Sequence, residues 1–339
     1  MSSAIRATLG TVRGMAKVLP SRAAPSAPWH ARRADDDYGE SDQPNWRDVD
    51  WASHLHQVEL NGRRVNYVDL GEEDAKPTVF VHGLGGQWQN WLENLPRVSQ
   101  KRRVIALDLP GHGLSEMPSD RIAISGYGRT VHALCERLGL ERVELVGNSM
   151  GGFVAAETAI QFPRLVEQLV LVSAAGITSA NVLRAPALTV GRIATAVTAY
   201  TAARHRQIAS RPITRHFALS LVARHPSKWK ADFAWEGFFK GTGKEGFEDA
   251  LRACIEYDFR DRLPEIERPT LIIWGEKDSV LSVEDADEFE RLIPNSKKVV
   301  LEDTGHVAMA ERPKAFNDML LEFLRVEEPH SGEAEAAAA

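Results

Sequence analysis

Runs of apolar and β-branched residues recur between residues 56 and 301, and each run is short enough to predict a β-strand. The first two, at 56–60 and 65–69, are joined through Asn61-Gly62, which is typical of a hairpin turn. The later runs are apolar at successive positions, which indicates strands buried on both faces of a parallel sheet. Helical patterns alternate with these runs, so we expect an α/β fold. The later runs are 78–82, 104–108, 143–146, 169–173, 270–274 and 298–301.

The alternation of strands and helices stops between residues 174 and 267. This stretch is helical in pattern and is interrupted by prolines and by Gly241-Thr242-Gly243. An insertion after a strand lies over the sheet edge where open α/β sheets bind ligands. We therefore expect residues 178–262 to form a helical cap. Its aromatic residues either contact substrate or form the cap's own core; they are Trp229, Phe233, Trp235, Phe238 and Phe239.

Both ends of the chain depart from this pattern. Residues 1–45 begin with apolar positions at helical spacing and continue with prolines and the run Asp35-Asp36-Asp37. We expect a basic, disordered N-terminal tail, with a transit peptide or an amphipathic membrane-surface segment as alternatives. Residues 46–326 should form the folded domain. Residues 327–339, rich in Glu and Ala, should form a disordered tail.

Composition narrows the class of protein. Hydrophobic residues make up 43% and charged residues 26% of the 339, as in ordinary globular proteins, and no apolar run approaches the 18 residues of a membrane span. Residues 1–34 hold six of the 41 Lys and Arg and no acidic residue, which leaves 35 basic against 47 acidic side chains elsewhere. An acidic body argues against a nucleic-acid partner. Cys135 and Cys254 lack metal-ligand spacing and indicate a reducing, cytoplasmic location, with contact to a membrane surface as the alternative.

One turn carries a candidate nucleophile. Gly147-Asn148-Ser149-Met150-Gly151 lies between a predicted strand and a predicted helix, which is the setting of a G-x-S-x-G nucleophile elbow. A serine held in a strained backbone conformation needs small neighbours, and the glycines supply them. We therefore expect Ser149 to be the nucleophile at the carboxyl edge of the sheet.

A serine nucleophile needs a base and an orienting acid, and the order along the chain selects them. His306 follows the last predicted strand in a glycine-containing loop, and Asp278 follows the strand before it. Glu276 is the second choice for the acid. The backbone N–H groups of Leu84 and Met150 are expected to form the oxyanion hole.

Five motifs together resemble those of the α/β-hydrolase fold superfamily. They are H-G-L-G-G from residue 82, D-L-P-G-H-G-L-S from 108, G-N-S-M-G-G from 147, W-G-E-K-D from 274 and G-H at 305–306. The resemblance covers about residues 56–325. It implies a mostly parallel eight-stranded sheet flanked by helices, a helical cap after the sixth strand, and a Ser–His–Asp triad.

The resemblance also bears on the type of reaction. Epoxide hydrolases and haloalkane dehalogenases of this superfamily carry an aspartate nucleophile where this chain has Ser149. The elbow is similar to that of meta-cleavage-product hydrolases, which break carbon–carbon bonds. Those enzymes typically have proline after the oxyanion glycines and an aromatic residue after the histidine, where this chain has Gln87-Trp88 and Val307.

We therefore expect a serine hydrolase, similar to carboxylesterases and monoacylglycerol lipases, that cleaves a carboxylic ester of a small hydrophobic substrate. A carbon–carbon hydrolase is the alternative, and a non-catalytic ligand-binding member of the fold is the second alternative. Trp88, Phe238 and Phe239 are expected to contact the substrate. No cofactor and no metal are expected, because a triad and two backbone donors suffice for acyl transfer.

Overall fold

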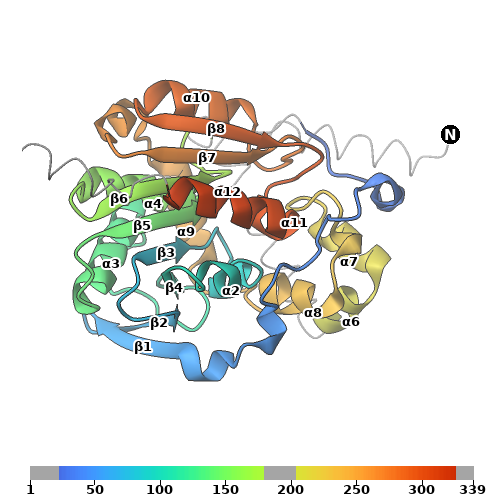
Figure 1. Cartoon of the computed structure of the whole chain (residues 1–339), viewed down its shortest axis with the longest axis horizontal. Helices are drawn as coiled ribbons and strands as arrows, with labels where there is room; N and C mark the ends of the chain where they lie inside the picture. Colours follow the sequence, from blue (N-terminus) through green and yellow to red (C-terminus); the bar gives the residue numbers. More distant parts are fainter. Residues whose placement is uncertain (1–22, 179–203, 326–339) are drawn as a thin grey trace, which may run out of the picture.

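A central sheet of eight strands organises the molecule, whose computed structural model describes residues 23–178 and 204–325 (Figure 1). The strand order is β1-β2-β4-β3-β5-β6-β7-β8. Strand β2 pairs antiparallel with β1 and with β4, and the other neighbours pair parallel. This arrangement confirms the predicted fold class. The strands are β1 (Leu55–Leu60), β2 (Arg63–Leu70), β3 (Pro77–Val81), β4 (Arg103–Leu107), β5 (Val143–Asn148), β6 (Val166–Val172), β7 (Thr270–Gly275) and β8 (Ser296–Leu301).

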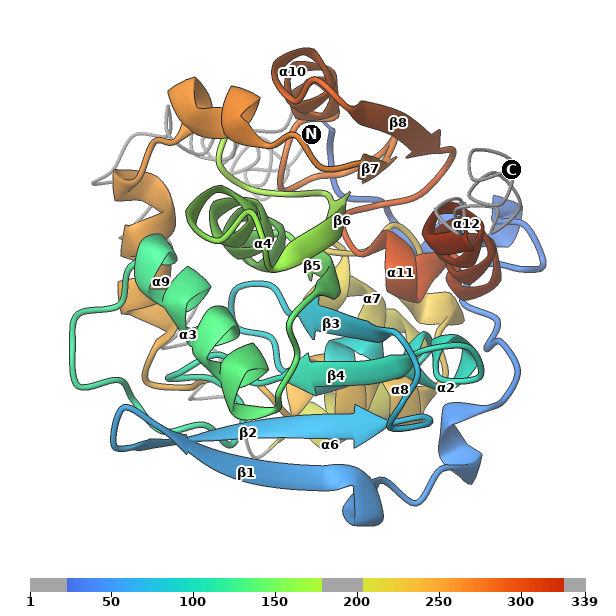
Figure 2. The ribbon, with the colours of Figure 1, turned by 60° about the vertical axis from the view of Figure 1, so that its left-hand side comes forward.

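Helices cover both faces of the sheet because the parallel strands are apolar on both sides. Alternate residues of one strand enter different cores: Leu169 and Leu171 lie in one, and Val170 lies in the other. The first core includes residues of α3 (Ile124–Arg137), α4 (Met150–Gln161) and α10 (Glu284–Leu292). The second includes residues of α2 (Leu95–Val98), α11 (Ala308–Glu311) and α12 (Pro313–Arg325). Figure 2 shows the sheet between these two layers.

Several short helices lie between β6 and β7, and we call residues 204–262 the inserted helices. They are α6 (His205–Ser210), α7 (Pro212–Leu219), η7 (Pro226–Lys228), α8 (Ala231–Ala234), a π-helix η8 (Trp235–Phe239), α9 (Phe247–Glu256) and the start of η9 (Arg260–Glu265). No acidic residue occurs between Glu167 and Asp232. The rest of the predicted cap, residues 179–203, lies outside the described residues.

The aromatic residues of the inserted helices pack mainly on one another. The Trp229 ring stacks on Phe238 with centroids 4.8 Å apart, and Phe233 meets Trp229 edge-on at 5.3 Å. Trp229 and Phe233 are almost fully buried. The sequence left open whether these aromatic residues contact substrate or form a core within the insertion. Trp229 and Phe233 form such a core.

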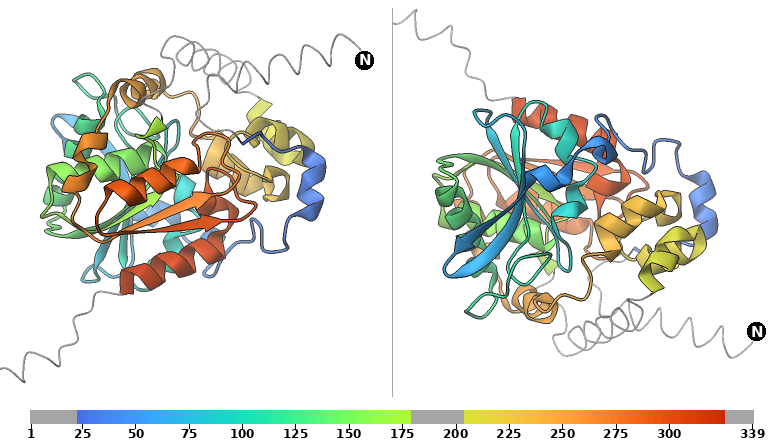
Figure 3. Two further views of the ribbon diagram at one scale, coloured as in Figure 1. Left: turned by 90° about the horizontal axis from the view of Figure 1, so that it is seen from above. Right: turned by 90° about the horizontal axis from the view of Figure 1, so that it is seen from below.

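The prediction of a disordered tail is wrong for residues 23–45. These residues and the following 46–54 form an N-terminal arm that contains η1 (Pro28–Arg33), η2 (Trp46–Asp48) and η3 (Trp51–His54). Figure 3 shows the arm, in blue, running beside the inserted helices. Asp35 and Asp37, which seemed to break regular structure, form ion pairs with Arg312 at 3.1 and 2.7 Å, and Tyr38 is 2% exposed. Charge partners and one buried aromatic thus fix a segment that lacks periodicity.

The disorder predicted for the two ends concerns residues 1–22 and 326–339, which lie outside the described residues. Within the described residues, no helix is long and apolar enough to cross a bilayer.

Candidate active site

Ser149 occupies the turn between β5 and α4 in a strained backbone conformation. Its φ is 56° and its ψ is −120°, which a residue with a side chain rarely adopts. Its N–H donates to the carbonyl of Val172 at 2.9 Å, and its own carbonyl accepts from Ala175 at 3.0 Å and from Phe153 at 3.1 Å. The surrounding strands and helix therefore hold the strained turn in place.

The two glycines of the turn are required by close backbone contacts. A Cβ on Gly147 would lie 2.1 Å from the carbonyl oxygen of Gly151. A Cβ on Gly151 would lie 2.1 Å from the carbonyl oxygen of Val81. Either side chain would collide with main chain, so the steric reason for the motif, expected from the sequence, applies here.

Asp278 and His306 meet in the loops that follow β7 and β8. His306 Nδ1 lies 2.7 Å from Asp278 Oδ2, and both side chains are buried. Asp278 Oδ1 accepts the N–H groups of Val280 at 2.8 Å and Leu281 at 3.0 Å. Because a carboxylate only accepts hydrogen bonds, Nδ1 carries a proton, and in the neutral ring Nε2 is then the nitrogen with the lone pair.

Glu276, the second choice for the acid, points elsewhere. It lies 2.7 Å from Lys277 Nζ and accepts the N–H of Asp303 at 3.2 Å, and its side chain is 42% exposed. Asp303 in turn pairs with Arg224 and His225. The structure therefore brings Asp278 to His306 and directs Glu276 to the surface.

Ser149 and His306 line one cavity of about 390 Å³. Leu84 and Phe238, both named from the sequence, also line it. Several aliphatic and aromatic lining residues were not foreseen, because they come from turns and helix ends without a motif of their own. They are Leu219, Leu221, Val222, Phe247, Val280 and Val307.

Trp88 and Phe239, which were also predicted as substrate contacts, are not among the residues that line this cavity. Trp88 is 4% exposed and packs against Trp51 of the N-terminal arm, with ring centroids 5.0 Å apart. Phe239 is 7% exposed and packs near His205 at 5.4 Å. Consecutive residues of a helix point in different directions, and here Phe238 lines the cavity while Phe239 packs near His205.

The loop after β3 passes beside Ser149 and is held by His82. A Cβ on Gly83 would lie 3.2 Å from the Ser149 Cβ, and Leu84 follows in the same loop. The His82 ring bridges two loops: Nδ1 donates to the Gly83 carbonyl at 2.7 Å, and Nε2 accepts the Leu109 N–H at 3.0 Å. Burial lowers the pKa of His82 to about 3, which keeps the ring neutral, as this pair of bonds requires.

Met150, the other predicted oxyanion donor, is the first residue of α4. The first N–H groups of a helix lack partners within the helix and favour negative charge nearby.

Within residues 23–178 and 204–325, no group of three or more His, Cys, Asp or Glu side chains could hold a metal ion.

Comparison with known proteins finds one matching family model and several similar proteins. The model of the alpha/beta hydrolase fold family matches residues 76–313. A dihydrolipoyllysine-residue acetyltransferase component of the acetoin cleaving system from Pseudomonas putida is 32% identical over 279 residues, which cover 79% of this chain and 69% of that protein.

Two further relatives are named as hydrolytic enzymes. A 3-oxoadipate enol-lactonase 2 from Acinetobacter baylyi is 31% identical over 257 residues, covering 75% of this chain and 90% of that protein. A 2-hydroxy-6-oxo-2,4-heptadienoate hydrolase from Pseudomonas putida is 31% identical over 285 residues, covering 80% and 96%.

Proposed function

The chain belongs to the α/β-hydrolase fold family and is an enzyme of that family, and we propose that it hydrolyses a carboxylic ester of a small hydrophobic substrate. The observation that carries the proposal is the 2.7 Å contact of His306 with Asp278 at the cavity that Ser149 also lines. The volume of this cavity falls within the range of about 300–1,000 Å³ that is common for small-molecule sites.

Each residue has a defined role in the proposed reaction. Ser149 Oγ attacks the ester carbonyl while His306 Nε2 takes its proton, and Asp278 stabilises the imidazolium that forms. The Leu84 and Met150 N–H groups stabilise the negative oxygen of the tetrahedral intermediate. His306 then gives the proton to the departing alcohol. Water, activated by His306, hydrolyses the acyl-enzyme and releases the acid. No step needs a metal or cofactor, so EDTA should leave hydrolysis unchanged.

The inserted helices supply the apolar wall of the proposed acyl pocket. Leu219, Leu221 and Phe238 from these helices line the cavity together with Ser149. We assign them the role of a cap that excludes water from the serine, which strengthens the oxyanion contacts in a medium of lower dielectric constant.

Carbon–carbon hydrolysis is the second candidate, because one relative is named as a heptadienoate hydrolase. Two positions weigh against it. The chain has Gln87 after the glycines of the loop following β3, and Val307 after His306, where the meta-cleavage-product hydrolases typically have proline and an aromatic residue. Non-catalytic ligand binding is not retained, since the relatives named above are enzymes.

One experiment tests the nucleophile and the bond type together. A fluorophosphonate probe should label the wild type and not Ser149→Ala. A panel of p-nitrophenyl esters of increasing acyl length, run beside a meta-cleavage diketone, should show turnover of the esters. Labelling that survives the substitution would refute Ser149 as nucleophile, and turnover of the diketone alone would establish the second candidate.

A further inference from the structure

The backbone on both sides of His306 is held by one buried carboxylate. Glu311, the last residue of α11, is fully buried. Its Oε2 accepts the N–H of Gly305 at 2.9 Å, and its Oε1 accepts the N–H of Val307 at 3.2 Å. Glu311 therefore fixes the main chain from which the His306 ring projects.

The same carboxylate receives a donor from the N-terminal arm. The Tyr38 hydroxyl donates to Glu311 Oε2, and the Arg224 N–H donates to the same oxygen at 2.8 Å. The Tyr38 hydroxyl also accepts the N–H of His225 at 2.7 Å, and the Gly39 N–H donates to the Glu311 carbonyl at 2.8 Å. Tyr38 is thus bonded both to Glu311 and to the inserted helices.

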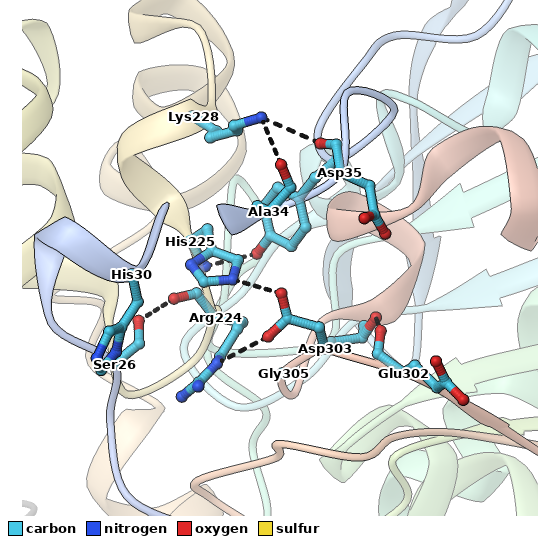
Figure 4. A network of polar contacts seen from close by, with 12 residues as sticks. Ser26, His30, Ala34, Asp35, Arg224, His225, Lys228, Glu302, Asp303 and Gly305 are labelled. Carbon is cyan, nitrogen blue, oxygen red and sulfur yellow. Dashed lines mark hydrogen bonds and ion pairs between the residues drawn. The ribbon is translucent and has the colours of Figure 1, made fainter. Parts of the chain in front are cut away.

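A second set of contacts ties the same three segments together (Figure 4). Asp303, in the loop that leads to His306, lies 2.7 Å from His225 Nε2 and 3.2 Å from Arg224 Nε. Lys228 Nζ donates to the carbonyls of Ala34 and Asp35 in the arm at 3.2 and 3.0 Å. The arm, the residues after α7 and the His306 loop therefore form one hydrogen-bonded unit.

We propose that Tyr38, in the arm that precedes the matched family region, is a positioning residue that acts through Glu311 to align His306 between Asp278 and Ser149. The proposal rests on the proposed role of His306 as the base. The physical reason is that a buried carboxylate needs hydrogen-bond donors to stay ionised. Without the Tyr38 hydroxyl, Glu311 more readily takes up a proton, and a protonated oxygen no longer accepts equally from Gly305 or Val307.

The charges around Glu311 set the direction of its titration. Burial raises the pKa of Glu311, and its hydrogen bonds from Tyr38, Arg224, Gly305 and Val307 lower it again. Other charged or titratable groups of the unit are Arg224, His225, Lys228, Asp303, Arg312 and His306. Loss of the Tyr38 donor therefore moves the pKa of Glu311 upward, so the effect on activity should grow as the pH falls.

The test compares Tyr38→Phe with a matched control. Tyr257→Phe also removes a hydroxyl that donates to a buried glutamate, Glu157, at 2.9 Å, but neither residue is among those that line the cavity of Ser149 and His306. With the best p-nitrophenyl ester, Tyr38→Phe should lower kcat about tenfold at pH 7 and change KM less than twofold. The kcat ratio of wild type to Tyr38→Phe should be larger at pH 6 than at pH 8.5. Tyr257→Phe should retain wild-type kcat.

The outcomes separate this inference from the proposed function. If the wild type neither hydrolyses the esters nor reacts with the probe, the proposed function fails, and with it the premise of the inference. If the wild type is active and Tyr38→Phe matches it, the inference alone is overturned. A kcat ratio that does not vary with pH, or an equal loss in Tyr257→Phe, also overturns it. A folded Glu311→Gln variant should lose more activity than Tyr38→Phe. If Glu311→Gln does not fold, the comparison of Tyr38→Phe with Tyr257→Phe still tests the inference.

Discussion

The serine turn stores backbone strain at the reactive residue. Ser149 has a positive φ that glycine adopts without steric cost. Ser149→Gly should therefore raise the free energy of unfolding by about 1 kcal/mol, while it abolishes hydrolysis. Urea denaturation measures this gain. Ser149→Ala is the control, because alanine keeps the Cβ and should show no gain; an equal gain in both variants would mean that the turn is not strained.

The two candidate acids should differ sharply when each is neutralised. Asp278→Asn removes the carboxylate that holds the His306 tautomer and should lower kcat by about 10⁴-fold. Glu276→Gln changes an exposed pair with Lys277 and should leave kcat within twofold. Steady-state kinetics on one ester give the ranking, and the reverse order would move the orienting role to Glu276.

Residues that sit in motifs at strand ends could be placed from the sequence, and residues that act through packing could not. Ser149, Asp278 and His306 lie in motifs that follow one another along the chain in the expected order. The structure brings Asp278 to His306. Trp88 packs against Trp51 of the N-terminal arm, a contact that no motif in the sequence records. The contact of Tyr38 with Glu311 joins residues 273 positions apart, and no periodic pattern records such a pair.

At the scale of elements, the loops after β3 and β4 are joined by two buried histidines. The rings of His82 and His112 lie 5.2 Å apart, and burial lowers the pKa of His112 from 6.5 to about 4. Because the folded-state pKa is below the unfolded one, unfolding takes up a proton as the pH falls below 6.5. The stability that the neutral ring contributes is therefore present above pH 6.5 and is lost toward pH 4.

This linkage predicts a measurable difference in slope. Between pH 6 and 5, the free energy of unfolding of the wild type should fall more steeply than that of His112→Gln, by about 1 kcal/mol per pH unit. Urea denaturation of both proteins at matched pH values isolates this histidine from the other titrating groups. Parallel slopes would show that His112 is protonated in the folded protein.

The inserted helices should set acyl-chain preference through the residue that faces the cavity. Phe238→Ala enlarges the apolar wall, and each further methylene that it accommodates contributes at most about 0.8 kcal/mol to binding. The optimum in kcat/KM should therefore shift to longer esters, with probe labelling intact. Phe239→Ala is the matched control, because Phe239 packs near His205 and should lower stability without a shift. A shift in both variants, or in neither, would count against Phe238 as the determinant.

The strands were easier to predict than the segments that surround them. Continuous apolar runs marked the strands from β3 to β7, since burial on both faces leaves a clear pattern. The edge strand β8 is only partly buried, and its apolar run is shorter. The N-terminal arm has short 3₁₀ turns and few apolar positions, so its order depends on ion pairs and on Tyr38. These contacts are made to Glu311 at the end of α11 and to Arg312, which follows it, far away along the chain.

For the whole molecule, the arm should be part of the stable unit. Removal of residues 1–45 deletes buried Tyr38 and the acids that pair with Arg312, and should lower the free energy of unfolding by at least about 3 kcal/mol. Urea denaturation tests this loss. Removal of residues 1–22 alone is the control, because it keeps Tyr38 and the acids that pair with Arg312, and it should change stability little. Equal stability of the shorter protein would show that the arm is dispensable.

Positive charge is concentrated in one stretch of the inserted helices. From residue 204 to 231 the chain has seven Arg and Lys side chains and no acid, in a protein whose net charge is −6. The residues of this stretch that line the cavity beside Ser149 are Ala218, Leu219, Leu221 and Val222. A local excess of positive charge attracts anionic molecules over about 10 Å at 0.1 M salt. The isoelectric point of about 6.0 does not reveal this local excess.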